Sequence, residues 1–216
     1  MSPTPAKSIE RIVLEGRYIR LEPVEQRHAS ELFAVSYTPD ASARYQWLPS
    51  NPPETEDAVA QWIEHANAGD DIYYAVIDKR TGKAVGRQGW MRIRPEHGSV
   101  EIGGIYWGLP MARSRLSTEA LFLFAQHAFD NLGYRRFEWK CNNRNEPSRA
   151  AAQRFGFVYE GLFRNDMIVK GESRDTAWFS IIESEWPVIR AEFARWLDPG
   201  NFDDLGQQKS KLVTRR

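Results

Sequence analysis

The sequence predicts a single α/β domain built around a mixed, mostly antiparallel sheet. Three observations support this fold class. The chain has 216 residues, of which 42% are hydrophobic, which is enough for one well-filled core but short of two. Strand-like alternation and helical periodicity follow one another along the chain without a linker or an internal repeat. The order is an antiparallel meander, then strand–helix–strand–helix, then a closing hairpin, and the strand–helix–strand unit predicts a right-handed crossover between two parallel strands.

The strands are predicted from alternating or continuous apolar runs that end at turn residues. In the first of them, Ile19 and Leu21 alternate with polar residues, so this strand is half buried. Turns at 81–83 and near 170–172 each divide a pair of strands. The predicted strand segments are 17–24, 71–94, 99–108, 135–142 and 157–182.

The helices are predicted from apolar residues three or four positions apart. Ala58, Trp62 and Ile63 have this spacing, and their helix ends at Gly69. The predicted helices are 25–37, 54–69, 114–132, 145–157 and 184–197.

Both ends of the chain are polar and lack apolar periodicity. We therefore expect residues 1–10 and 198–216 to be flexible tails around a domain that covers residues 11–197.

Charge and cysteine content narrow the classes of function. Lys and Arg together number 29, as do Asp and Glu, so no overall charge attracts nucleic acid. The single cysteine, Cys141, excludes an internal disulfide and a cysteine zinc cluster, and the four histidines are scattered, so we expect no metal site. The amino terminus lacks the apolar region of a signal peptide, and no run approaches the roughly 20 apolar residues that span a bilayer. We expect a cytoplasmic protein that binds neither membranes nor nucleic acid.

The segment 113–118, with the sequence RSRLST, lies between a predicted strand and a predicted helix. The first amides of a helix lack intrahelical partners and lie at the positive end of its dipole, and arginine pairs well with phosphate. The segment is therefore a candidate cradle for a diphosphate. The alternative is an ordinary N-cap by Ser114 or Ser117 beside solvated arginines, and the residues alone favour neither. The glycine motifs of P-loop and Rossmann nucleotide sites are absent.

Four stretches together give the chain a family resemblance: SVEIGGIYWG at 99–108, RSRLSTEAL at 113–121, NNRNEPSRAAAQRFGFVYEG at 142–161, and KGESRDTAWFS at 170–180. On these stretches the chain resembles the GNAT (GCN5-related) N-acetyltransferases, and most closely the branch that includes the ribosomal-protein alanine acetyltransferases (RimJ/RimL-like). The resemblance covers about residues 12–185. It implies a twisted sheet with helices on both faces, a splayed strand pair, and direct transfer of an acetyl group from acetyl-CoA to a primary amine without a metal.

The resemblance also implies where the coenzyme binds. The family's pyrophosphate loop, Q/R-x-x-G-x-G/A, falls on residues 112–117, where Ala112 replaces the Gln or Arg and Arg115 replaces the first glycine. The splay falls at Gly103 and Gly104, for which a crowded sheet face is the equal alternative. The implied coenzyme contacts are Ile105, Tyr106, Arg113, Ser114, Arg115, Leu116, Ser117, Thr118 and Asn145.

Glu101 is the candidate general base, because it matches a strand glutamate with this role in some members of the family. Alternation places it on the sheet face opposite Val100 and Ile102. The alternative is a solvent-facing carboxylate paired with Arg92 or Arg94.

Ser148 matches a serine proposed to protonate the leaving thiolate in the ribosomal-protein branch. Ala152 stands where many relatives have a tyrosine for this purpose. The alternatives are structural: Asn145 is also a suitable N-cap for the helix that follows, and Ser148 is then a first-turn hydroxyl.

These features predict an acetyl-CoA-dependent N-acetyltransferase whose acceptor is the amine of a small molecule or of a protein N-terminus. They leave open the acceptor, the preferred acyl chain and a homo-oligomer. The alternative function is a weakly active or inactive GNAT-fold protein that binds acyl-CoA, and Ala112, Arg115 and Ala152 motivate it.

Overall fold

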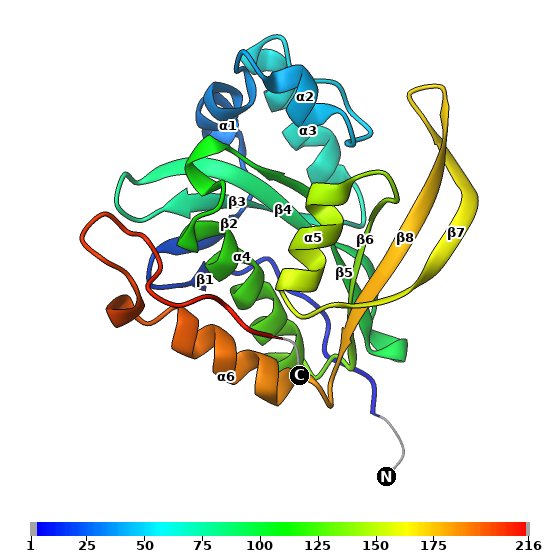
Figure 1. Ribbon diagram of the computed structural model, residues 1–216. Helices are drawn as coiled ribbons and strands as arrows, with labels where there is room; N and C mark the ends of the chain where they lie inside the picture. The colour runs from blue at the N-terminus through cyan, green and yellow to red at the C-terminus, as the bar shows by residue number, and fades with distance from the viewer. Residues whose placement is uncertain (1–3, 215–216) are drawn as a thin grey trace.

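The computed structural model describes residues 4–214 and confirms the predicted fold class (Figure 1). Within these residues, one sheet contains eight strands in the order β1-β2-β3-β4-β5-β6-β8-β7. Neighbouring strands are antiparallel except β5 and β6, which are parallel and joined by a helical crossover, as predicted. The strands are β1 (Leu14–Glu15), β2 (Ile19–Pro23), β3 (Ile72–Asp78), β4 (Lys83–Arg94), β5 (Ser99–Trp107), β6 (Arg136–Asn142), β7 (Val158–Val169) and β8 (Glu172–Ile182).

Helices cover both faces of the sheet. On one face, α4, α5 and α6 contribute to the larger apolar core, and on the other α1 and α3 pack on β3 and β4 around a smaller cluster (Figure 1). The helices are α1 (Ala29–Ser36), α2 (Ala41–Tyr45), α3 (Glu56–Ala68), α4 (Arg115–Gln126), α5 (Glu146–Arg154) and α6 (Trp186–Trp196). A π-helical turn, His127–Asn131, extends α4.

The central helix α4 is anchored in its second turn and near its carboxyl end. The buried carboxylate of Glu119 accepts hydrogen bonds of 2.7–2.8 Å from the backbone N–H groups of Arg17, Tyr18 and Ile19. One turn further along the helix, the ring of Phe124 stacks on Trp90 with centroids 3.8 Å apart. Because these contacts anchor α4 to β2 and to β4, the amino end of the helix has a fixed position relative to the sheet.

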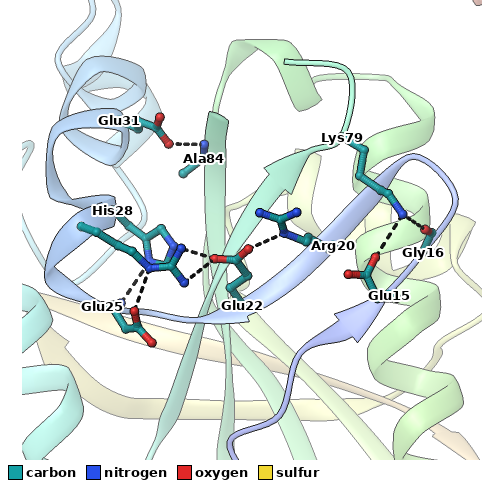
Figure 2. A network of polar contacts seen from close by, with 10 residues as sticks. Glu15, Gly16, Arg20, Glu22, Glu25, His28, Glu31, Lys79 and Ala84 are labelled. Atoms are coloured by element: carbon teal, nitrogen blue, oxygen red, sulfur yellow. Dashed lines mark hydrogen bonds and ion pairs between the residues drawn. The ribbon is translucent and has the colours of Figure 1, made fainter. Parts of the chain in front are cut away.

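A buried polar network joins β2 to α1 (Figure 2). Nε2 of His28 lies 3.0 Å from Oε2 of Glu22, and Nδ1 of His28 accepts the backbone N–H of Glu25. Burial raises the pKa of Glu22, but hydrogen bonds from His28 and Arg20 and the charge of Arg27 outweigh it and hold this pKa below its ordinary value. The network fixes the start of α1 on the sheet.

The structure also differs from the sequence prediction. The short elements β1 and α2 were not expected, since two and five residues show no periodicity. The segment after residue 197, expected to be a flexible tail, packs on α6 as far as Thr214, because the side chains of Phe202 and Leu212 are buried in the core. The domain boundaries themselves stay a prediction. Within residues 4–214, no helix is long and apolar enough to cross a membrane.

Candidate active site

The two parallel strands β5 and β6 separate partway along their length. They pair at three rungs, from Ser99–Arg136 to Glu101–Glu138, and no further, although β5 continues to Trp107. Antiparallel pairing with β4 continues along the other edge of β5. Ile105 and Tyr106, two predicted coenzyme contacts, therefore lie on a stretch of β5 whose edge toward β6 has no strand partner. This is the predicted splay.

At Gly103 and Gly104 the structure shows both features that the sequence offered as alternatives, a bulge and a crowded sheet face. Between two consecutive pairs of the β4–β5 ladder, β5 advances by three residues, from Gly103 to Tyr106, whereas β4 advances by only two. The strand β5 therefore bulges here. Gly104 has φ +58°, a conformation that favours glycine, and an added Cβ would lie 2.4 Å from Cε1 of Tyr73. The same face is thus crowded as well as bulged.

The amino end of α4 follows β5 and is capped by Ser114, whose Oγ accepts the N–H of Leu116 at 3.2 Å. The hydroxyls of Ser117 and Thr118 are buried and directed at the carbonyl oxygen of Ser114. Both hydroxyls are therefore engaged within the protein, and the hydroxyl of Thr118 also accepts from Arg154 at 3.1 Å. Their role as coenzyme contacts stays a prediction. The first-turn amides of Arg115 and Ser117 lack intrahelical partners by helix geometry.

The two arginines of this segment lie differently. Arg113 is exposed and has φ +52°, which is unfavourable for a residue with a Cβ. The guanidinium of Arg115 lies over the ring of Tyr18 at 4.3 Å and over that of Phe202 at 5.2 Å. It is therefore not simply solvated, and neither alternative from the sequence included its aromatic partners.

Glu101 lies on the last rung before the splay and is not a solvent-facing carboxylate, since only 1% of it is exposed. Its Oε2 is 3.2 Å from Nζ of Lys140 and 3.7 Å from Nε of Arg92, one of the two predicted partners. Burial raises the pKa of Glu101 to about 7, although the positive charges of Lys140 and Arg92 act in the opposite direction. A buried carboxyl group that titrates near neutrality is suited to accept a proton from an amine.

Glu138 is the partner of Glu101 on this rung and is also buried. It contacts Arg136 at 2.7 Å and Arg92 at 3.4 Å, yet its Oε2 accepts no hydrogen bond within the described residues. We missed Glu138 and Lys140 from the sequence. The alternation of RRFEWKCN carried the signal, because it places both on the face opposite Phe137, Trp139 and Cys141.

At the start of α5, the structural roles predicted for Asn145 and Ser148 are present. Oδ1 of Asn145 accepts the N–H of Ser148 at 3.1 Å, which makes Asn145 the N-cap. Oγ of Ser148 accepts the indole N–H of Trp139 at 3.0 Å. The hydroxyl proton of Ser148 is not used in that bond, and Ser148 also forms a side-chain hydrogen bond with the thiol of Cys141.

The far side of the site is closed by two segments that the sequence did not single out. The guanidinium of Arg44, in α2, donates to the carbonyl oxygen of Trp107 at 2.5 Å and lies over the ring of Tyr106. At the tip of the β7–β8 hairpin, Nζ of Lys170 donates to the carbonyl oxygen of Tyr45 at 2.9 Å. The hairpin tip and α2 therefore meet, although they lie far apart in the sequence.

Residues 19–158 match the family profile described as an acetyltransferase (GNAT) domain. The fold is similar to the crystal structure of a GCN5-related N-acetyltransferase from Brucella melitensis, with a TM-score of 0.94 and 53% identity over 97% of this chain and 96% of that one.

Two curated bacterial relatives are similar over shorter stretches. The uncharacterized N-acetyltransferase p20 of Bacillus licheniformis is 30% identical over 117 residues, which are 52% of this chain and 63% of p20. YdaF of Bacillus subtilis (strain 168), provisionally named a ribosomal N-acetyltransferase, is 35% identical over 88 residues, which are 40% of this chain and 47% of YdaF. The matches thus span about half to two thirds of the length of these relatives.

Proposed function

Since the chain belongs to the GNAT acetyltransferase family, we propose that it transfers the acetyl group of acetyl-CoA directly to a primary amine. The observation that carries this proposal is the position of Glu101. This buried carboxylate, with a pKa of about 7, occupies the last rung before β5 and β6 separate. A proton acceptor at the apex of the splay is where an amine that attacks a thioester between the strands would need it.

The chain has groups suited to holding acetyl-CoA along the splay. The unpaired edge of β5 at Ile105 and Tyr106 offers backbone groups to an extended pantetheine arm. The first-turn amides of Arg115 and Ser117 and the dipole of α4 suit the diphosphate, and exposed Arg113 can add a charge-assisted contact. Asn145 lies at the amino end of α5, on β6's side of the opening.

In the proposed reaction, Glu101 accepts a proton from the amine, whose neutral nitrogen attacks the thioester carbon. A backbone N–H of the Ile105–Tyr106 stretch donates to the carbonyl oxygen as negative charge develops there. The carbon–sulfur bond breaks, and the nitrogen loses its second proton, which the hydroxyl of Ser148 relays to the leaving thiolate. Ser148 ends unchanged, and Glu101 releases its proton to solvent. Lys140 and Arg92 keep the side chain of Glu101 in place through their ion pairs.

The acceptor is proposed to be a small-molecule amine or a protein N-terminus, and the similarity to YdaF supports the second. We also propose that the enzyme works in the cytoplasm, that no metal takes part, and that the catalytic domain corresponds to residues 11–197.

The test combines calorimetric titration with acetyl-CoA and thiol release over a panel of amines and N-terminal peptides. We expect binding and amine-dependent release from the wild type, at least a hundred-fold lower kcat in Glu101→Gln, and nearly equal coenzyme affinity in the two. Glu64→Gln, which changes an exposed carboxylate on α3, is the matched control and should behave as the wild type. Coenzyme binding without release for every acceptor would instead support the acyl-CoA-binding alternative, and loss of binding would reject both.

A further inference from the structure

A pocket of about 420 Å³ opens beside the last β5–β6 rung, on the same sheet face as Glu101. Its floor includes Glu138 and Lys140 of β6, and the latter is ion-paired with Glu101. Its outer wall is β7, including Phe163, Asp166 and Met167. Under the proposed function, this pocket offers an acceptor amine a route toward Glu101.

Three carboxylates lie on the acceptor side of the hairpin, and the structure distinguishes them. Glu160 is paired with the guanidinium of Arg136, at 2.5 and 2.6 Å, and accepts from Ser180. Asp175 accepts the backbone N–H of Asn165 at 2.8 Å, so it is engaged within the hairpin. Asp166 lines the pocket, is exposed, and has no hydrogen-bond or ion-pair partner among residues 4–214.

The hairpin holds Asp166 in this position by a bulge. Residues 164–166 of β7 stand opposite Asp175 alone, because the register passes from Phe163 to Met167 while β8 advances by only two residues. Asn165 adopts φ +50°, and its side chain accepts from Ser173 at 2.9 Å. Bulges of this kind commonly redirect a side chain near a binding site.

The wall of the pocket is also suited to a ligand. Phe163 and Met167 are 54% and 42% exposed, so the wall presents large apolar side chains to solvent.

We propose that Asp166 binds a cationic group of the acceptor, which therefore carries a positive charge in addition to the amine that is acetylated. This inference rests on the proposed function, since it concerns the acceptor of that reaction. The reacting nitrogen has to be neutral near Glu101, whereas Asp166 is on a different strand at the exposed side of the pocket. The other carboxylates of the pocket, Glu138 and Glu160, already have arginine partners. The shared chemistry is a dication with an apolar spacer, which a small diamine or a peptide N-terminus followed by a basic residue would supply.

The test compares two matched pairs of acceptors: 1,5-diaminopentane with 1-aminopentane, and a short peptide that begins Ala-Lys with one that begins Ala-Gln. We expect the wild type to favour the dication about two- to five-fold in kcat/KM in the pair that resembles the physiological acceptor. This preference should shrink as salt is added. Asp166→Asn should abolish most of this preference through KM. Glu172→Gln, an exposed carboxylate of the same hairpin outside the pocket lining, should keep it.

Because Asp166 is exposed, its substitution does not threaten folding, and coenzyme affinity should stay as in the wild type. A wild type that acetylates monocations as well as dications, or an Asp166→Asn variant that keeps the preference, would overturn this inference while the acetyltransferase function stands. If none of the four acceptors supports thiol release, the inference is overturned. The panel of amines and N-terminal peptides then decides the proposed function separately.

Discussion

Replacing Glu101 by Gln should remove activity. It should also make the protein increasingly stable relative to the wild type as pH rises from 5 to 8. The native carboxyl group has a pKa of about 7 because it is buried, against an ordinary value of 4.5. Between these two values the folded protein holds a proton that the unfolded chain has released. The free energy of unfolding therefore falls as pH rises from about 4.5 to about 7, and Glu101 causes this loss. Gln resembles the protonated carboxyl group and does not titrate.

The size of the effect follows from the two pKa values. They differ by about 2.5, and each pKa unit corresponds to about 1.4 kcal/mol, so the total is about 3 kcal/mol. The part that falls between pH 5 and pH 8 is about 2.5 kcal/mol. The stability of E101Q relative to the wild type should rise by this amount over that range, which is about 5–10 °C in Tm for a domain of this size.

The measurement is urea denaturation of wild type, E101Q and E64Q at half-unit intervals from pH 5 to pH 8. Titrating groups that do not interact with Glu101 are common to wild type and E101Q, so their contributions cancel in the difference. E64Q alters an exposed residue, and its curve should run parallel to that of the wild type. A difference between E101Q and wild type that is constant with pH would refute the assignment of a raised pKa to Glu101. In the same range, wild-type kcat/KM should increase with pH through about 7, as the base becomes ionised.

Three further substitutions test other parts of the site. Glu119→Ala leaves three backbone N–H groups without their carboxylate, so it should lower the free energy of unfolding by about 3–5 kcal/mol in urea denaturation; a loss below 1 kcal/mol would contradict its anchoring role. Gly104→Ala should cost about 2–3 kcal/mol, because of the positive φ and the 2.4 Å approach to Tyr73. Gly133→Ala serves as its control, because Gly133 has φ +77° but open space around it, and should cost only about 1 kcal/mol. Equal losses of stability in the two variants would show that the close approach to Tyr73 contributes nothing. Arg115→Ala should lower stability by about 0.5–1 kcal/mol through its contacts with Tyr18 and Phe202, and weaken coenzyme binding about three-fold at low salt; unchanged stability would show that these ring contacts contribute nothing.

The sequence predicted the order of the main elements and the face on which Glu101 lies, because both follow from periodicity. Alternation of apolar residues placed Val100 and Ile102 in the core and Glu101 opposite them, and the structure agrees. Periodicity contains no information about what covers the other face. The burial of Glu101 depends on Lys140 and Arg92, which come from different strands, and only their pairing in the sheet brings these residues together.

Contacts between distant segments were the part that could not be predicted. Arg115 contacts Phe202, from a segment that composition alone assigned to a flexible tail, and Lys170 contacts Tyr45 across most of the chain. In the same way, the bulge that presents Asp166 depends on the register between β7 and β8. A bulge is defined by a strand having more residues than its partner between two paired positions, so it cannot be located until the partner strand and its register are known.

The positions of Arg113 and Arg115 explain how the loop can depart from the family pattern without losing an amide donor. A glycine is required only where φ is positive or where a backbone approaches too closely for a Cβ. Arg115 is the first residue of α4, and the left-handed conformation of this turn falls on Arg113 instead. A side chain at 115 therefore carries little conformational cost, and its N–H is retained at the positive end of the helix. The guanidinium lies over Tyr18 and Phe202, which keeps its bulk off the first turn of α4. Arg115 thus adds a positive charge over Tyr18 and Phe202, while the helix keeps the N–H that a glycine at this position would supply.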